Sequence, residues 1–224
     1  CALPISGWRY WMPGPPSASS ADSATQLAHN ALHSDDEMQQ VSGAVHQVIR
    51  VEVAELSPKN RRHFSRLETW SQPLENRGTL RWSYPGSGLR YAHWRAGESS
   101  YVYNPAVARS VVGSRSQSTA VVFLSELPLG GMDVYQLQAA LLQWLQNKDW
   151  RAIELSREFA EFAGGDGVRL RLQQTAETAR LIAERGGRSG RATAILELDR
   201  WTNRPRFVAR RFERDGQAAE IRLV

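Results

Sequence analysis

Short segments in which hydrophobic and polar residues alternate, separated by turn-forming residues, make up most of the chain. A period of two is the pattern of a strand with one buried face, and Gly, Pro or Asn between such segments favours tight turns. Consecutive strands joined by tight turns pair antiparallel. Between residues 78 and 124 the pattern predicts strands over Thr79–Tyr84, Leu89–Arg95, Ser100–Tyr103, Val107–Val112 and Ser118–Leu124.

The alternation continues on both sides of this central meander. Val41–Leu56 fits either a strand or one face of a helix, and its β-branched residues favour the strand. The remaining predicted strands are His63–Trp70, Val168–Gln174, Ala192–Leu198, Arg206–Phe212 and Ala218–Val224.

Helical spacing is confined to a few segments. Asp133–Lys148 carries an apolar stripe with a period near 3.6, and its first residue is a suitable N-terminal cap. Ala21–His33 has similar spacing. Ala176–Arg185 indicates a short helix that ends at Gly186–Gly187.

The order of these elements defines the fold class. We predict an α+β domain over residues 24–224, in which a strongly curved antiparallel sheet forms a half-barrel and helices cover its concave face. Residues 1–23 are rich in Pro, Gly and Ser, and we interpret them as an arm or tether. The hydrophobic content of 42% excludes a disordered chain, and no apolar run approaches the roughly 20 residues of a membrane-spanning helix.

Cys1 is the only cysteine in the sequence. A first-position cysteine remains when the signal peptide of a bacterial lipoprotein is removed, so we expect Cys1 to carry acyl chains such as palmitate. Two or three chains give stable attachment to a membrane. This hypothesis predicts a periplasm-facing protein of the bacterial cell envelope, held to a membrane by its lipidated N-terminus, with the outer membrane favoured.

Charge changes the picture mainly at the C-terminal end. The chain has 28 Lys and Arg against 23 Asp and Glu, and from Arg185 onward ten Arg face five acids. Such a segment is either a solvated basic face or a surface for anionic lipid or nucleic acid. Because no nucleic-acid motif accompanies it, we predict no specific nucleic-acid partner, and only weak anion binding that salt removes.

Candidates for catalysis or metal binding are few. His29 and His33 have the i, i+4 spacing that can place two imidazoles on one metal, but no third ligand lies nearby. No serine has a nucleophile-elbow context, and the Gly86–Gly88 turn lacks the Lys and helix of a phosphate loop. We therefore predict no enzyme activity, no metal and no cofactor.

The segment from Gly78 to Pro105 resembles a known family. It contains Gly-Thr-Leu-Arg-Trp at 78–82, Tyr-Pro-Gly at 84–86 and Tyr-Val-Tyr-Asn-Pro at 101–105. Together with the closing meander, these motifs are similar to the LolA-type outer-membrane lipoprotein carriers and their relatives, including LolB. Cys1 is LolB-like, whereas Ser83–Gly86 replaces the Arg-Pro turn of the carriers, so the arginine that locks the LolA lid has no counterpart.

The resemblance implies a half-barrel that holds an acyl chain, lipoprotein cargo or another apolar ligand between sheet and helices, without chemical turnover. Large apolar residues of the meander and of the 133–148 helix are then expected to line the site, although only alternate residues of a strand face inward. These candidates are Trp82, Tyr84, Leu89, Tyr91, Tyr101, Tyr103, Leu137, Leu141, Trp144 and Leu145.

The alternative is a structural lipoprotein with the same fold and a filled core, which docks other envelope proteins. An unfilled apolar cavity of about 300 Å³ or more between sheet and helices distinguishes the carrier from this docking subunit.

Overall fold

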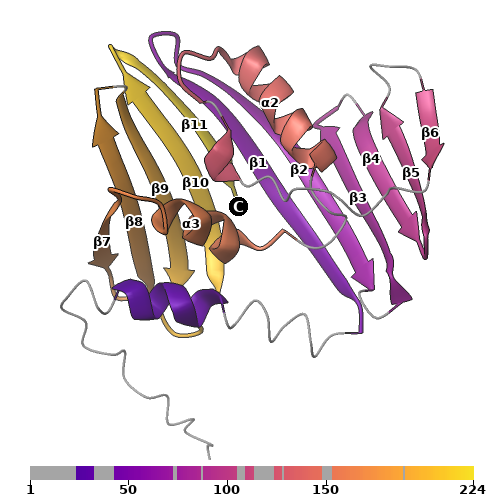
Figure 1. Ribbon diagram of the computed structural model, residues 1–224, viewed down its shortest axis with the longest axis horizontal. Helices are drawn as coiled ribbons and strands as arrows, with labels where there is room; N and C mark the ends of the chain where they lie inside the picture. The colour runs from indigo at the N-terminus through magenta and orange to yellow at the C-terminus, as the bar shows by residue number, and fades with distance from the viewer. Residues whose placement is uncertain are drawn as a thin grey trace, which may run out of the picture.

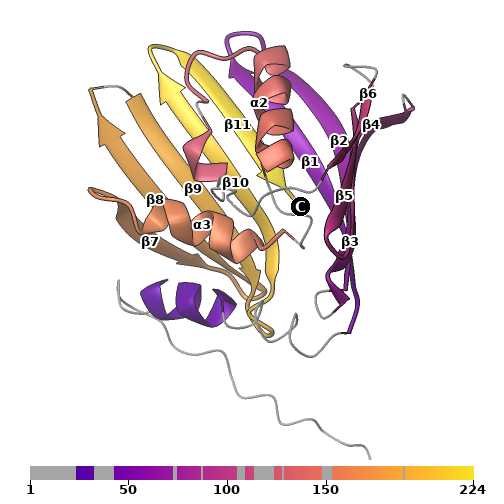
Figure 2. The same ribbon diagram turned by 45° about the vertical axis from the view of Figure 1, so that its right-hand side comes forward.

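A computed structural model describes residues 24–32, 43–72, 75–86, 88–104, 109–113, 124–127, 129–147, 153–188 and 190–224. These residues form an 11-stranded antiparallel sheet with helices against one face. The sheet curves around the helices (Figures 1 and 2), which confirms the predicted α+β half-barrel. The predicted arm, residues 1–23, lies outside the described residues together with Cys1.

The first and last strands of the chain lie at the centre of the sheet, and the strands between them in sequence follow in order toward the two edges. Their order is β6-β5-β4-β3-β2-β1-β11-β10-β9-β8-β7. The first and last strands pair at the centre, where Val51 lies opposite Leu223 and Val53 opposite Ile221. The strands are β1 (Val45–Ser57), β2 (Arg61–Gln72), β3 (Arg77–Tyr84), β4 (Gly88–Ala96), β5 (Ser99–Asn104), β6 (Arg109–Gly113), β7 (Arg169–Gln174), β8 (Thr178–Gly187), β9 (Gly190–Asp199), β10 (Pro205–Arg214) and β11 (Gln217–Leu223).

Most predicted strands are confirmed, with small shifts at their ends. The ambiguous Val41–Leu56 segment contains β1, as its β-branched residues favour. The predicted strand Ser118–Leu124 lies outside the described residues except for Leu124, which begins the short 3-10 helix η3 (Leu124–Glu126).

One predicted helix is wrong. Ala176–Arg185 is rich in helix-forming residues, yet most of it belongs to strand β8. Its residues Ala179, Leu181 and Ala183 belong to the core, Arg180 and Glu184 occupy the opposite face, and β8 is hydrogen-bonded to β7 and β9 on its two sides. Burial of one face in the sheet outweighs the intrinsic helix propensity.

Helices α2 (Val134–Asn147) and α3 (Leu155–Ala163) lie on the concave face, where α2 packs on β1 and β2 and α3 on β8, β9 and β10. The predicted cap of α2 is confirmed, because Asp133 Oδ1 accepts the backbone N–H groups of Tyr135 at 3.0 Å and Gln136 at 2.9 Å. Gln136 Oε1 in turn accepts the N–H of Asp133 at 3.0 Å, which completes a capping box. A further helix over residues 24–32 confirms the described part of the predicted Ala21–His33 helix and lies below α3 in Figure 1.

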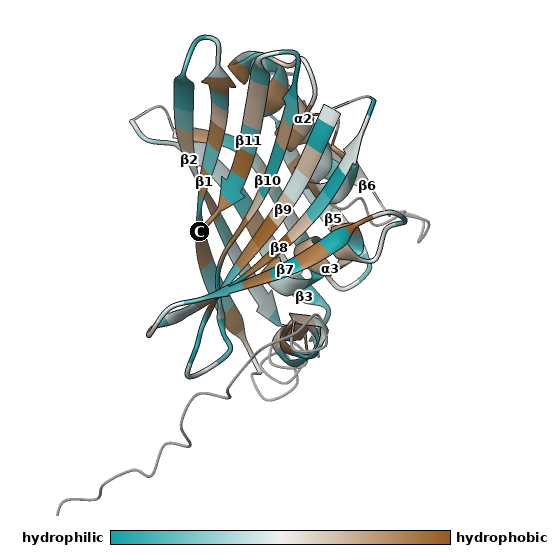
Figure 3. Ribbon diagram, turned by 90° about the vertical axis from the view of Figure 1, so that its left-hand side faces the viewer, coloured by the Kyte–Doolittle hydropathy of each residue, from teal (hydrophilic) through white to brown (hydrophobic). Residues whose placement is uncertain are grey.

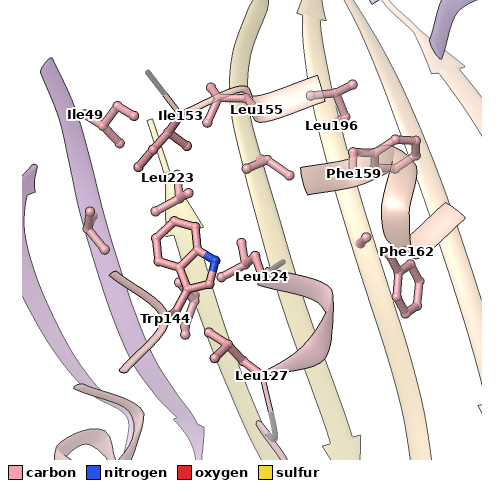
Figure 4. Packing of buried hydrophobic residues seen from close by; sticks show 14 of the residues in the cluster. Ile49, Leu124, Leu127, Trp144, Ile153, Leu155, Phe159, Phe162, Leu196 and Leu223 are labelled. Carbon is pink, nitrogen blue, oxygen red and sulfur yellow. The ribbon is translucent and has the colours of Figure 1, made fainter. Parts of the chain in front are cut away.

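The hydrophobic core lies between the helices and the concave face of the sheet. Figure 4 shows the indole of Trp144 in the middle of this core, with Leu124 and Leu127 close to it and Phe159 and Phe162 contributed by α3. Hydrophilic and hydrophobic bands alternate along the strands (Figure 3), as expected when one face is buried. None of the helices among the described residues has the length and apolar character needed to cross a membrane.

Candidate ligand-binding site

Six of the ten predicted ligand-binding residues lie in the core. Trp82 and Tyr91 are cross-strand partners on β3 and β4 and face the concave side, with exposures of 3% and 1%. The α2 residues are at most 1% exposed and belong to the same hydrophobic cluster. The structure therefore brings these residues together, but in a region that is filled by their own side chains. The α2 residues are Leu137, Leu141, Trp144 and Leu145.

Of the other four predicted residues, only Tyr84 packs against this group, with its ring centroid 5.2 Å from that of Trp82. Tyr84 and Leu89 are half-buried near the β3–β4 turn, and burial raises the pKa of the Tyr84 hydroxyl. Tyr101 and Tyr103 on β5 are 43% and 37% exposed, on the face opposite to the core. The alternation of the strand places both tyrosines of the Tyr-x-Tyr motif on the convex side.

A pocket of about 760 Å³ lies at another place on the concave side, between η3, the C-terminal end of α3 and strands β8–β10. None of the ten predicted residues lines it. Its apolar walls come from Leu127, Leu129, Phe162, Ala192 and Phe212. Its polar lining comes from Ser125, Glu126, Glu161, Arg185 and Arg210, and glycines complete the wall at 130, 165, 186, 187 and 190.

Small side chains on the inner face of β8 and β9 leave room for this pocket. Ala192 lies between Arg185 on β8 and Phe212 on β10, and one row further along the sheet Ala194 lies between Ala183 and Arg210. Ala192 lines the pocket, so a large aliphatic residue in its place would reach into this space.

The loop after η3 closes one side of the pocket by resting on an aromatic ring. A Cβ atom added to Gly130 would lie 2.6 Å from Cε1 of Phe212, so only glycine allows the backbone to approach the ring this closely.

Arg210 is a buried cation at the base of the pocket. It is 5% exposed, and its Cζ lies 3.8 Å from the centroid of the Phe162 ring. Its Nη1 and Nη2 atoms donate to the carbonyl oxygens of Thr193 and Ser125 at 3.4 and 3.3 Å, whereas Nε has no hydrogen-bond partner. In the part of the chain that the structure describes, no carboxylate forms an ion pair with Arg210.

A second arginine intensifies the positive charge. Arg185 also lines the pocket, with its Cζ 5.5 Å from the same Phe162 ring. Burial first, and the charge of Arg185 second, lower the pKa of Arg210 to about 10, so it remains cationic at neutral pH. The acids Glu126 and Glu161 are exposed at the rim, and neither makes an ion pair with these arginines within the described residues.

The sequence carries a signal for this site on strand β10. On β10 the inward set is Val208, Arg210 and Phe212, so an arginine occupies the middle of an otherwise apolar face. The abundance of arginine from Arg185 onward conceals this signal, because it favours a single basic surface for all of these arginines. As for metals, no group of three His, Cys, Asp or Glu side chains in the described residues is placed to hold one.

The fold and the pocket define an open half-barrel with a ligand-sized, cation-lined hollow on its concave side. No family model matches the chain, and no curated protein matches it. Among solved structures, the crystal structure of the LolA superfamily protein NE2245 from Nitrosomonas europaea is similar at a TM-score of 0.34 and 12% identity, covering 92% of each chain.

Proposed function

We propose that the protein binds an acyl chain or another apolar ligand between its sheet and its helices, without chemical turnover. The observation that supports this proposal is the pocket of about 760 Å³ beside α3, whose volume lies in the range of small-molecule sites. The site residues proposed for the ligand are therefore those of this pocket rather than the core residues beneath α2.

The walls of the pocket provide the driving force for such binding. Leu127, Phe162 and Phe212 line it, and each methylene group of a ligand that leaves water for such a surface contributes about 0.8 kcal/mol. The pocket is open in the structure as it stands, and Ala192, one of its lining residues, contributes only a methyl group to its wall.

A titration of the full chain with a fluorescent fatty acid tests this function. We expect saturable binding that Phe162→Ala weakens, since the ring of Phe162 is a wall of the pocket. Phe64→Ala is the matched control, because Phe64 is 45% exposed on the convex face. Absence of saturable binding, or equal loss in both variants, would exclude this pocket as the ligand site.

The membrane anchor and the location in the envelope form a separate part of the proposal. We propose that acylated Cys1 holds the domain at the periplasmic side of a bacterial membrane, where acyl chains or lipoprotein cargo are available. Cys1→Ser is expected to move the protein from the membrane to the soluble periplasmic fraction. Intact-mass spectrometry of the membrane form provides the control, and an unmodified mass would contradict the anchor.

A second candidate function, docking to another envelope protein, is favoured by an aromatic row on the convex face. His46, Trp70, Thr79, Trp94 and Tyr101 are successive cross-strand partners from β1 to β5. The rings of His46 and Trp70 stack with centroids 4.4 Å apart, and Trp94 and Tyr101 are 36% and 43% exposed. Exposed aromatic groups of this kind are typical of protein interfaces.

Photo-crosslinking in cells tests this second candidate. A crosslinking amino acid at position 94 should yield one defined protein adduct, whereas the same amino acid at the exposed position 64, on the same convex face, should not. No adduct at position 94, or the same adducts at both positions, would contradict docking through the aromatic row.

A further inference from the structure

We propose that the pocket beside α3 recognises an oxyanion, the carboxylate or phosphate group of its ligand, through Arg210 and Arg185. For the apolar part of the ligand this inference rests on the proposed function, but the anion site itself is argued from the two arginines.

The first argument is the burial of Arg210 without a compensating charge. Removing a cation from water is costly unless an opposite charge or full hydrogen bonding replaces the lost hydration. Arg210 has only two long hydrogen bonds, to neutral carbonyl oxygens, and its Nε–H has no partner in the structure. An anion in the pocket would supply the missing countercharge.

The second argument is the position of the two arginines on the sheet. Arg185 lies opposite Ala192, and Arg210 lies opposite Ala194. The two arginines therefore belong to adjacent cross-strand rows of residues on the same concave face. The ring of Phe162 lies near both guanidinium groups, at 3.8 and 5.5 Å from their Cζ atoms. Two guanidinium groups that converge on one ring present several N–H donors in the planar arrangement that suits carboxylate and phosphate.

The third argument is the contrast with the other arginines of the C-terminal strands. On the convex face, Arg171 and Arg191 pair with Glu184, and Arg180 pairs with Glu197. Within the described residues, the two pocket arginines have no such carboxylate. The pocket arginines are therefore available to an external anion, whereas Arg171, Arg180 and Arg191 are already paired with acids of the chain.

The ligand chemistry that fits is an amphiphile with one anionic end. Its oxyanion would lie between Arg185 and Arg210, and its apolar part would lie against Leu127, Leu129 and Phe212. The same anion site would also accept a free phosphate, so the experiment has to separate a lipid headgroup from an inorganic ion.

The experiment compares four probes on the full chain by calorimetric titration: oleate, oleyl alcohol, an oleoyl lysophosphatidate and inorganic phosphate. We expect oleate and the lysophosphatidate to bind at least tenfold more tightly than oleyl alcohol, which has the same chain without a charge. Inorganic phosphate is expected to bind more weakly than either anionic lipid, because it lacks the apolar part.

Two variants and a control assign this preference to the arginines. Arg210→Met and Arg185→Gln should each reduce the affinity for oleate by about tenfold or more and leave that for oleyl alcohol unchanged. Arg204→Gln, an exposed position away from the pocket with the same loss of charge, should change neither. Arg210→Met should also leave the thermal midpoint unchanged or raise it, because a buried cation without a carboxylate partner is replaced by an apolar side chain.

The outcomes separate the two proposals. Equal affinities for oleate and oleyl alcohol would overturn the anion site and leave the binding of apolar ligands standing. Phosphate binding that requires Arg210, without any lipid binding, would support the anion site and contradict the proposed function. Absence of binding by all four probes would overturn both proposals. A lower thermal midpoint of Arg210→Met together with unchanged oleate affinity would overturn the anion site alone.

Discussion

Two helices lie on the same concave face, but the strands beneath them carry side chains of different size. Beneath α2, strands β1 and β2 present Ile49 and Leu67, which pack against the buried residues of the helix. Near the C-terminal end of α3, strands β8 and β9 present Ala183, Ala192 and Ala194. The helices cover both regions, so the size of the inward strand residues determines which part of the half-barrel is filled and which is hollow.

The largest effect on stability is expected from truncation in the filled region. Leu141→Ala should lower the free energy of unfolding by about 2–5 kcal/mol, because Leu141 is fully buried and its removal leaves a cavity. Denaturant titration measures this loss, and oleate affinity should remain unchanged. Gln143→Ala, exposed on the same helix, is the control and should change stability by no more than about 0.5 kcal/mol. A small loss of stability together with loss of oleate binding would place the ligand beneath α2 and reverse the comparison.

A smaller effect on stability is expected from filling the hollow region. Ala192→Leu extends a side chain into the pocket and should block oleate binding, at a cost in unfolding free energy of less than about 1 kcal/mol.

The matched substitution in the filled region should behave in the opposite way. Ala140→Leu on α2 adds the same atoms to a well-packed site, so it should cost about 1–3 kcal/mol and leave oleate binding intact. If the two variants lost the same stability, the two regions would not differ in packing.

The smallest effect is a loss of stability at acidic pH in the turn between β9 and β10, two of the strands that line the pocket. Asp199 accepts hydrogen bonds from Arg206, from the backbone N–H groups of Trp201 and Thr202, and from the hydroxyl of Thr202. The hydrogen bond from Arg206 is the main reason that its pKa is lowered to about 2 from 3.8. A carboxylate whose pKa is lower in the folded state stabilises the fold above the unfolded pKa and loses this effect as the pH falls through the folded pKa.

Amide hydrogen exchange as a function of pH tests this prediction. Between about pH 4 and pH 2, opening of the β9–β10 turn should increase relative to opening of α2. Asp199→Asn keeps an acceptor oxygen but cannot titrate, so its exchange ratio should not depend on pH in this range. Parallel changes in the turn and in α2 would mean that the two regions open as one unit.

The sequence was sufficient for most of the sheet and for α2 because their patterns are strong over many residues. In α2, the apolar stripe and the Asp133 cap agree with each other. Strand β8 was misjudged because its composition favours a helix, and only its place between β7 and β9 makes it a strand.

The candidate site was much less predictable than the fold. Tyr101 and Tyr103 were candidates for the inner face, but the sequence of a strand does not state which alternate set faces the core. The pocket depends on which small residues meet across β8, β9 and β10, and this follows from the register of strands rather than from any local motif. Arg210 could have been recognised by its position between Val208 and Phe212 on the apolar side of β10.

The central pairing of β1 with β11 also has a consequence for folding. Every other neighbouring pair in the sheet joins consecutive strands, so each half of the half-barrel is a local meander that can form by itself at low loop-closure cost. The seam between the halves, where Val224 and Arg50 exchange backbone hydrogen bonds of 2.9 and 2.7 Å, requires contacts between distant parts of the chain. A circular permutant that begins at η3 and joins Val224 to Ala24 by a linker would keep the helix over residues 24–32, which contributes Ala24, Leu27 and Ala31 to the core. In this permutant β11 and β1 lie close together along the chain, so the seam no longer depends on contacts between its distant ends. Such a chain should reach the same half-barrel faster than the natural order allows.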